Sequence, residues 1–170
     1  MIRISVDTTP LEKVLASMLA KLKDRRPLMR KIAGDLSDAV EENFEKEGRP
    51  AWEPLARATV AARGRKGHWP GRILQVSGML HNSVSSRYDD SSAVVGTNLR
   101  YAAIHQFGGT VTRYPQSRLM RTATKKAPAR KAHTMGQHTI TIPARPFLRL
   151  TEADTGHIKE TIRIHLEGGK

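Results

Sequence analysis

The sequence predicts a single-domain protein of the α+β class, in which a small antiparallel sheet packs against amphipathic helices and a long basic hairpin arm extends from the sheet. Three observations predict it. The 170 residues are 38% hydrophobic, which suffices for one core over residues 1–170. Helical periodicity occurs near both ends of the chain, and β-branched residues alternate with polar ones between them. Two of the predicted strands flank a stretch rich in Lys and Arg.

The N-terminal part of the chain predicts a short strand and two helices. Apolar and polar residues alternate over residues 1–6, the pattern of a half-buried strand. A helix from Pro10 to about residue 23 carries one apolar stripe: Leu11, Val14, Leu15, Met18, Leu19 and Leu22. A second helix is expected over residues 27–47, with Gly48 as its left-handed cap and these residues facing inward: Leu28, Ile32, Leu36, Ala39, Val40 and Phe44. Both helices need a sheet or a partner to cover them.

A surface connection is expected over residues 49–72, because three prolines and three glycines leave no sustained period. One helical turn is expected within it, near residues 58–63. Trp52 and Trp69 are its only large apolar residues, and the commoner role of each is packing. After it, Ser77 can cap a short helix that carries Leu80.

Two antiparallel strands, residues 83–89 and 92–98, are expected around a tight polar turn. Residues 101–109 then predict two helical turns ended by Gly108. The last helix is capped by Thr151 or Asp154, with Ile158, Ile162 and His165 or Leu166 facing inward.

The extended hairpin arm occupies residues 110–142. Residues 110–114 and 138–142 are β-branched and alternating, so they can pair as its base. Residues 115–137 between them cannot bury enough apolar surface to offset roughly 1 to 2 kcal/mol of backbone ordering per residue. We therefore expect this segment to be mobile in the isolated subunit and ordered once it meets a partner.

The formal net charge of +13 indicates an anionic partner, which could be nucleic acid, a membrane surface or an acidic protein. The charge is local, because residues 54–72 and 110–133 contain no acid. No apolar run approaches the roughly 18 residues of a membrane span. We expect no membrane among the partners. The candidate contacts on the arm are Arg113, Arg118, Arg121, Lys125, Lys126, Arg130 and Lys131. A basic surface that is merely solvated is the alternative.

Catalytic and cofactor-binding patterns are missing. The chain has no cysteine, which excludes disulfides, thiol nucleophiles and every zinc site that uses Cys. Phosphate-binding loops, HExxH and GxSxG are not found. His105, His133 and His138 could share a metal, as in a histidine-metal hydrolase, but they lack helical spacing and a carboxylate partner. We expect no enzyme, no cofactor and no metal.

Three segments in sequence resemble the phage virion morphogenesis family, which contains tail-completion proteins of Mu-like and contractile-tailed bacteriophages. The first joins residues 44–63 with residues 73–84; the second is residues 94–109, with the run YAAIHQFGG; the third is residues 142–154, with IPARPF. The resemblance implies a structural virion protein at the neck end of the tail, made in the bacterial host cytoplasm. It also implies a homo-oligomeric ring, of six subunits, that contacts neck or connector proteins and the tail-tube protein.

The matched motifs first suggest structural roles. Gly96 fits a bulge or close approach, Gly108 a left-handed turn, and the prolines around Arg145 an extended entry to the last helix. Arg145 has the best claim to a specific contact, either with an intrachain carboxylate or with a neighbouring subunit. His105 is expected to pack beside Tyr101.

A basic nucleic-acid-binding protein acting alone is the alternative function. Near the arm only Tyr114 could stack on a base, but contact with phosphates needs no aromatic residue. Within a ring the arm could touch DNA non-specifically or meet acidic protein. Protein is favoured, because a ring gripping phosphates at many points could impede DNA passage.

Overall fold

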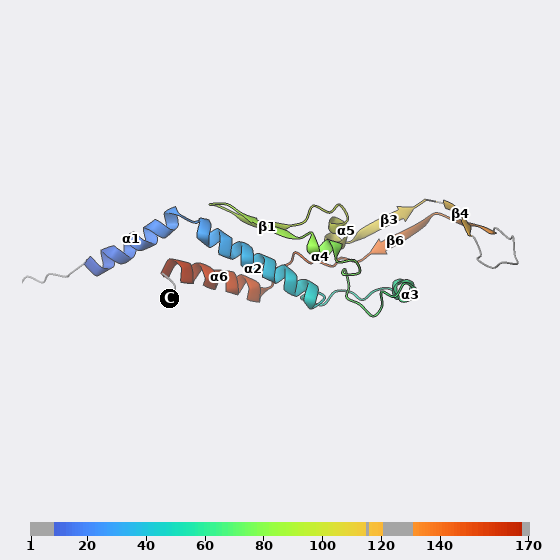
Figure 1. Ribbon diagram of the computed structural model, residues 1–170, viewed down its shortest axis with the longest axis horizontal. Helices are drawn as coiled ribbons and strands as arrows, with labels where there is room; N and C mark the ends of the chain where they lie inside the picture. Colours follow the sequence, from blue (N-terminus) through green and yellow to red (C-terminus); the bar gives the residue numbers. More distant parts are fainter. Residues whose placement is uncertain (1–8, 115, 121–130, 168–170) are drawn as a thin grey trace, which may run out of the picture.

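The computed structural model describes residues 9–114, 116–120 and 131–167, which form an elongated α+β structure (Figure 1). The strand expected at residues 1–6 lies outside them. The helices are α1 (Thr9–Lys23), α2 (Arg26–Glu45), α3 (Arg57–Arg65), α4 (Met79–Asn82), α5 (Ala102–Phe107) and α6 (Glu152–Glu167). The strands are β1 (Ser85–Tyr88), β2 (Ala93–Gly96), β3 (Gly109–Arg113), β4 (Gln116–Met120), β5 (Lys131–Met135) and β6 (His138–Ile142).

The predicted fold class is confirmed, since small antiparallel sheets pack against helices. The described strands form the antiparallel pairs β1–β2, β3–β6 and β4–β5. The pair β1–β2 and helix α6 both contact α2, so α2 is the central element of the body (Figure 1). The pairs β3–β6 and β4–β5 follow one another along a hairpin that projects away from α2.

Helix α2 forms where the periodicity predicts it, with Pro27 in its first turn. Its C-terminus differs in detail from the prediction. Glu47, with φ of +53°, takes the left-handed position, and Gly48 follows at +102° and donates its N–H to the carbonyl of Asn43 at 2.8 Å. A Cβ on Gly48 would lie 2.4 Å from Cδ1 of Trp52, so this position requires glycine for space as well as for conformation.

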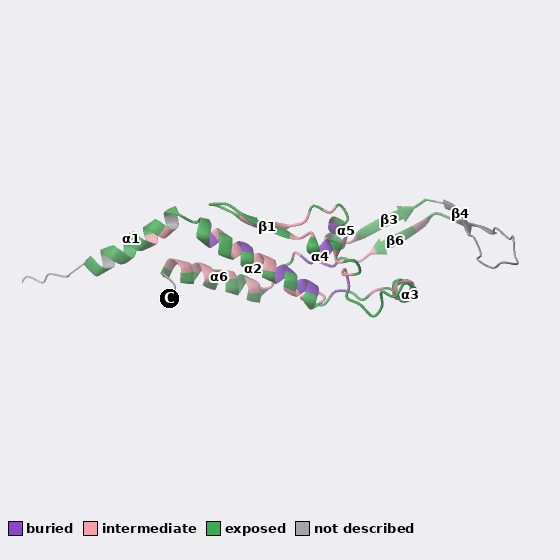
Figure 2. Ribbon diagram, in the orientation of Figure 1, coloured by how far each residue is buried: buried purple, intermediate pink, exposed green. Residues whose placement is uncertain are grey.

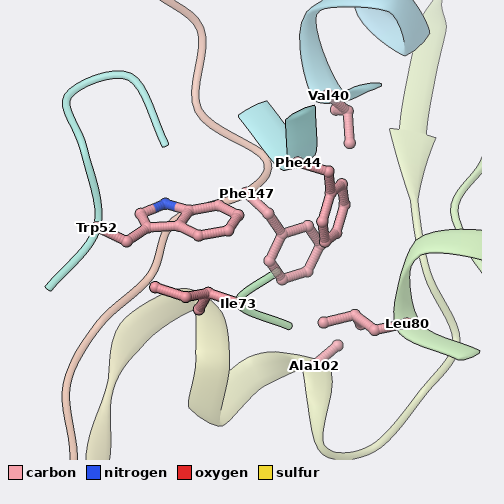
Figure 3. Packing of buried hydrophobic residues seen from close by; sticks show 7 residues of the cluster. All are labelled: Val40, Phe44, Trp52, Ile73, Leu80, Ala102 and Phe147. Atoms are coloured by element: carbon pink, nitrogen blue, oxygen red, sulfur yellow. The ribbon is translucent and has the colours of Figure 1, made fainter. Parts of the chain in front are cut away.

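Aromatic rings from distant parts of the chain form the core (Figure 3). Phe44 and Phe147 are fully buried, with ring centroids 5.4 Å apart. Trp52 meets Phe44 edge-on at 5.9 Å and is 6% exposed, which confirms its packing role. Trp69 is 41% exposed and does not belong to this core.

The connection over residues 49–72 contains more helix than expected, because α3 spans nine residues rather than one turn. Helix α3 has no buried residue, so no apolar periodicity in the sequence could predict it. The short helix that carries buried Leu80 starts after Gly78 in a left-handed conformation, with Ser77 one residue further out. The Ser77 hydroxyl accepts the N–H of Met79 at 3.4 Å.

The pairing expected at the base of the arm is confirmed, with β3 beginning and ending one residue earlier than predicted, so that Val111 lies opposite Ile140 and Arg113 opposite His138. Within residues 115–137, expected to be mobile, β4 and β5 also pair. An antiparallel ladder is held by backbone hydrogen bonds, which apolar composition does not report. The expectation for residues 115 and 121–130 lies outside the described residues. Gly96 was misinterpreted, since it pairs regularly with Ser85 and a Cβ there would meet nothing within 4 Å.

Helix α1 leaves the body at one end and exposes its apolar stripe (Figures 1 and 2). Val14, Leu15 and Leu19 are 51%, 50% and 59% exposed. Its last turn approaches α6, where the Lys21 Nζ donates to the carbonyl of Leu166 at 3.4 Å. The covering partner that the sequence calls for is thus not supplied by the described part of the chain.

Candidate functional site

The hairpin arm carries seven of the eight residues that the sequence singles out as subunit or partner contacts. Arg113 ends β3 with an exposed side chain. Arg118 lies on β4, and Lys131 lies on β5. The remaining four lie outside the described residues: Arg121, Lys125, Lys126 and Arg130. Arg113, Arg118 and Lys131 therefore share one projecting hairpin (Figure 1).

The ribbon formed by β3 and β6 has two chemically different faces. Opposed residues of an antiparallel pair point to the same face, and successive residues alternate. One side, here named the Val111 face, contains Val111, Arg113, His138 and Ile140. The other side, the threonine face, contains Thr110, Thr112, Thr139 and Thr141. Val111 and Ile140 are 38% and 37% exposed, so the Val111 face is apolar, positively charged and largely open to solvent.

Arg145 lies apart from the arm and is 5% exposed. Its Nε and Nη2 donate to the carbonyl of Glu53 at 3.1 and 2.9 Å, and Nη2 also donates to the carbonyl of Pro54 at 3.2 Å. Burial lowers the pKa of the guanidinium, and the nearby charge of Glu53 opposes this. Of the two contacts considered for Arg145, an intrachain carboxylate or a neighbouring subunit, the described contact is within the chain, and its acceptors are two backbone carbonyls and not a carboxylate. Arg145 therefore fastens the proline-bounded segment to residues 53–54 and offers little surface to another subunit.

His105 packs where the sequence places it, edge-on to Tyr101 with ring centroids 6.0 Å apart. Its carbonyl accepts the N–H of Arg145 at 2.6 Å, and its buried Nδ1 has no described hydrogen-bond partner. Burial, followed by the charge of Arg145, lowers the pKa of His105 below 6.5. Gly108 follows α5, the helix that contains His105, and has φ of +72°. A Cβ on Gly108 would lie 2.8 Å from the backbone nitrogen of Ala144. The YAAIHQFGG motif thus joins α5 closely to the segment before α6.

An ion-pair network between α2 and α6 was missed by the sequence analysis. Arg49 Nη1 and Nη2 donate to the two oxygens of Asp154, each at 2.9 Å, and Nη1 also binds Glu42. The sequence offers Thr151 or Asp154 as the cap of α6, and the two cap it together through reciprocal hydrogen bonds. The Thr151 and Arg49 bonds lower the pKa of Asp154 although burial acts the other way. The sequence signal was the capping pair; nothing in it identified Arg49 as the partner.

Asn43 completes the joint and was also missed. It is fully buried, and its Nδ2 donates to the carbonyls of Phe147 and Arg149 at 2.9 and 2.7 Å. Its Oδ1 accepts the Nε of Arg49 at 2.9 Å. A buried polar side chain satisfied in this way fixes the position of its neighbours. Helical spacing places Asn43 beside Phe44 but cannot show that it is buried.

A groove of about 680 Å³ runs between α2 and α6. Its carboxylates are Asp35, Asp38, Glu42, Glu45 and Asp154, and its cations are Lys46 and Arg49. The strongly basic chain therefore has a distinctly acidic surface of its own, away from the arm (Figure 1).

No group of three His, Asp or Glu residues that could hold a metal is found within residues 9–114, 116–120 and 131–167. Of the three histidines considered for a metal, the side chain of His133 is not described, and Nδ1 of His138 lies 3.2 Å from the carbonyl of Gly136. The search of the described helices for one long and apolar enough to cross a membrane found none.

Comparison with known proteins gives related phage proteins. The model of the phage virion morphogenesis family matches residues 6–167. Mu-like prophage FluMu G protein 2 of Haemophilus influenzae is 38% identical over 143 residues, covering 84% of this chain and 79% of the relative. Putative capsid assembly protein G of Escherichia phage Mu is 29% identical over 164 residues, covering 94% and 90%. No solved structure matches the chain.

Proposed function

Because the chain belongs to the phage virion morphogenesis family, it has a structural role in assembling the phage particle, and we propose that it is a subunit of a homo-oligomeric ring at the neck end of the tail. In this proposal six copies form the ring, which completes the tail and joins it to the DNA-filled head. Its partners are other copies of the chain, neck or connector proteins, and the tail-tube protein. The proposal assigns no catalytic residue, cofactor or metal.

The observation that carries the proposal is a pair of uncovered surfaces on opposite sides of the body. Helix α1 exposes its apolar stripe at one end, and the ribbon exposes the Val111 face at the other (Figures 1 and 2). A subunit with two different, unsatisfied surfaces can associate head to tail, and such contacts close into a ring when the rotation allows. The name of the phage Mu relative, a capsid assembly protein, supports a place near the head.

Native mass measurement tests the ring. The full-length protein should give a species of six times the 18.9 kDa chain mass, alone or after mixing with tail-tube protein. A protein that stays monomeric in both conditions, and binds duplex DNA with a steep salt dependence, would instead be the nucleic-acid-binding alternative.

The role of the arm is tested in the particle. Replacing Arg118, Arg121, Lys125 and Lys126 by Ser should leave the fold of the body intact, because the described core contains no residue of the arm. Attachment of tails to heads should fail. Electron microscopy should then show both DNA-filled heads and free tails accumulating. If heads and tails join normally and only DNA retention or ejection fails, the arm contacts DNA. The proposal that the arm contacts a protein would then be wrong.

A further inference from the structure

Helix α3 and the loop that follows it, residues 57–72, form a small lobe with an uncovered surface, here named the α3 lobe. Hydrogen bonds close the lobe: the N–H of His68 donates to the carbonyl of Arg63 at 2.9 Å, and Nη1 of Arg63 donates to the carbonyl of Arg72 at 3.2 Å. The helix buries no residue, and no other described helix or strand packs extensively against it. Isolated helices shorter than about 12 residues are marginal in water, so the lobe gains from a surface that covers it.

The surface of the α3 lobe is basic, because residues 54–72 contain no acid. Four of its cations are exposed, and their side chains make no hydrogen bond or ion pair with the described residues: Arg57, Arg65, Lys66 and Arg72. Trp69 lies among them in the sequence and is 41% exposed. Trp and Arg are enriched among the residues that contribute most to binding at protein interfaces. The lobe thus has the composition of an interface for an acidic partner.

The groove between α2 and α6 presents an acidic surface. Four of its carboxylates follow at helical spacing along one face of α2: Asp35, Asp38, Glu42 and Glu45. The first is bound by the hydroxyl of Thr161 at 2.8 Å, and the third by Arg49. The other two, Asp38 and Glu45, are exposed and make no side-chain hydrogen bond or ion pair with the described residues. These two carboxylates are available to cations from outside.

The lobe and the groove do not meet within one subunit. Helix α3 lies beyond the C-terminal end of α2, whereas the groove runs alongside α2 and α6 (Figure 1). No ion pair among the described residues joins them. Their dimensions correspond, however. The axis of α3 advances about 12 Å from Arg57 to Arg65, and the axis of α2 advances about 10 Å from Asp38 to Glu45.

We propose that the α3 lobe of one subunit docks in the groove between α2 and α6 of a second copy of this chain. The inference rests on the proposed ring and names one of the contacts that close it. Because the lobe and the groove are different surfaces, each subunit gives its lobe to one neighbour and its groove to the other, which is the heterologous arrangement a ring requires. Their opposite charges also select this pairing and speed encounter.

Two charge-reversed variants test the contact. The groove variant carries Asp38→Lys and Glu45→Lys, which leaves the Arg49 network in place. The lobe variant reverses the four exposed lobe cations to Glu: Arg57, Arg65, Lys66 and Arg72. Each variant alone should lose at least nine-tenths of the hexamer in native mass spectra at low salt, because equal charges then face each other and are weakly screened.

Matched controls reverse exposed charges elsewhere on the described chain. The control for the groove variant carries Asp24→Lys and Asp90→Lys. The control for the lobe variant has four other cations replaced by Glu: Arg30, Arg87, Arg100 and Lys159. Each control has the same net charge as the variant it matches, and both should keep the hexamer. Equal loss of the hexamer in variants and controls would show an effect of net charge alone and would overturn the contact.

Mixing the groove and lobe variants is the decisive step. The acidic lobe then fits the basic groove and the basic lobe fits the acidic groove, so hexamers should reappear with three copies of each variant in alternation. Hexamers that persist in either variant alone, or a mixture that stays unassembled, would overturn the docking contact while leaving the ring in place. Absence of a hexamer of the wild-type protein would instead overturn the proposed function, and the contact with it.

Duplex DNA is the competing partner for a basic lobe that carries an exposed Trp. A lobe variant that keeps the hexamer but no longer binds duplex DNA would assign the lobe to nucleic acid and overturn the docking contact. The complementary charge on the same chain favours the second copy, so we expect the lobe variant to lose the hexamer.

Carbodiimide coupling tests the contact without charge reversal. The reagent joins an amine to a carboxylate that touches it, and Lys66 is the only lysine of the lobe. In hexamers built from isotopically light and heavy chains, peptides that link a light chain to a heavy one should contain Lys66 joined to Asp38 or Glu45. In the control Lys66→Arg, the charge remains but coupling is blocked, so the hexamer should persist without these peptides. Wild-type hexamers whose light–heavy peptides lack Lys66 would contradict the contact.

Discussion

At the scale of single residues, the buried hydrogen bonds of Arg145 predict how much this side chain contributes to stability. Arg145→Lys keeps the charge but removes the planar fork that reaches the carbonyls of Glu53 and Pro54. Leaving one or more buried carbonyls unpaired should lower the free energy of unfolding by about 1 to 3 kcal/mol. Urea denaturation measures this change in the free energy of unfolding. Arg113→Lys, at an exposed position, is the control and should change stability by less than about 0.5 kcal/mol.

His105 predicts a dependence of stability on pH. Its pKa in the folded protein is lowered below the unfolded value of 6.5, so the unfolded chain binds more protons between those two values. The free energy of unfolding should therefore fall as the pH is lowered below 6.5, by at most about 1.4 kcal/mol per pH unit from this group. Urea titrations at several pH values measure the slope. His105→Gln should reduce it, whereas His68→Gln, at an exposed position, should not.

The residues that sequence analysis identified correctly are those with local signatures. Thr151 and Asp154 form a cap three positions apart, and Gly108 ends a helical pattern. Arg49 and Asn43 were missed because their partners lie about 105 residues away in the chain. Arg145 was recognised as special, but only the fold shows that backbone carbonyls receive it.

At the scale of elements, substitutions in the exposed stripe of α1 should affect assembly much more than folding. Leu15→Ser with Leu19→Ser removes half-exposed apolar side chains, so the thermal midpoint of the isolated subunit should change by only a few degrees. The hexamer should weaken, because the stripe is one of the two uncovered surfaces. Circular dichroism and native mass spectrometry measure the two effects. Ala16→Ser with Ser17→Ala, beside the stripe, is the control; a hexamer unaffected by the leucine changes would exclude α1 from the interface.

Apolar periodicity predicted the elements that carry it, whether or not the described chain covers them, and failed for those that lack it. α2, the β1–β2 hairpin and the β3–β6 pairing follow their apolar spacing closely. Helix α3 buries no residue, and the β4–β5 ladder lies where the composition suggested no order. The hydrophobic pattern depends on apolar side chains. Elements that are stabilised mainly by their own backbone hydrogen bonds are therefore hard to predict from it.

At the scale of the whole molecule, the arm should be separable from the body. Arg113 and His138 are directly opposite, so residues 114–137 can be replaced by Asn-Gly, which favours a two-residue hairpin turn. The shortened protein should keep the far-ultraviolet spectrum of its helices and a similar thermal midpoint. It should form no hexamer. Replacement of the same segment by a Gly/Ser linker of equal length should also give monomers; if either protein assembles normally, the arm does not hold the ring.

The core in Figure 3 has a consequence for how the protein is made. Phe44 is covered by Phe147, and the buried Asn43 binds carbonyls at residues 147 and 149. These partners leave the ribosome only after the entire arm has been synthesised. A nascent chain that ends within the arm therefore exposes its central aromatic residues, and we expect the body to close only near the end of translation. Subunits would then enter assembly as finished, released chains and not while they are still being made.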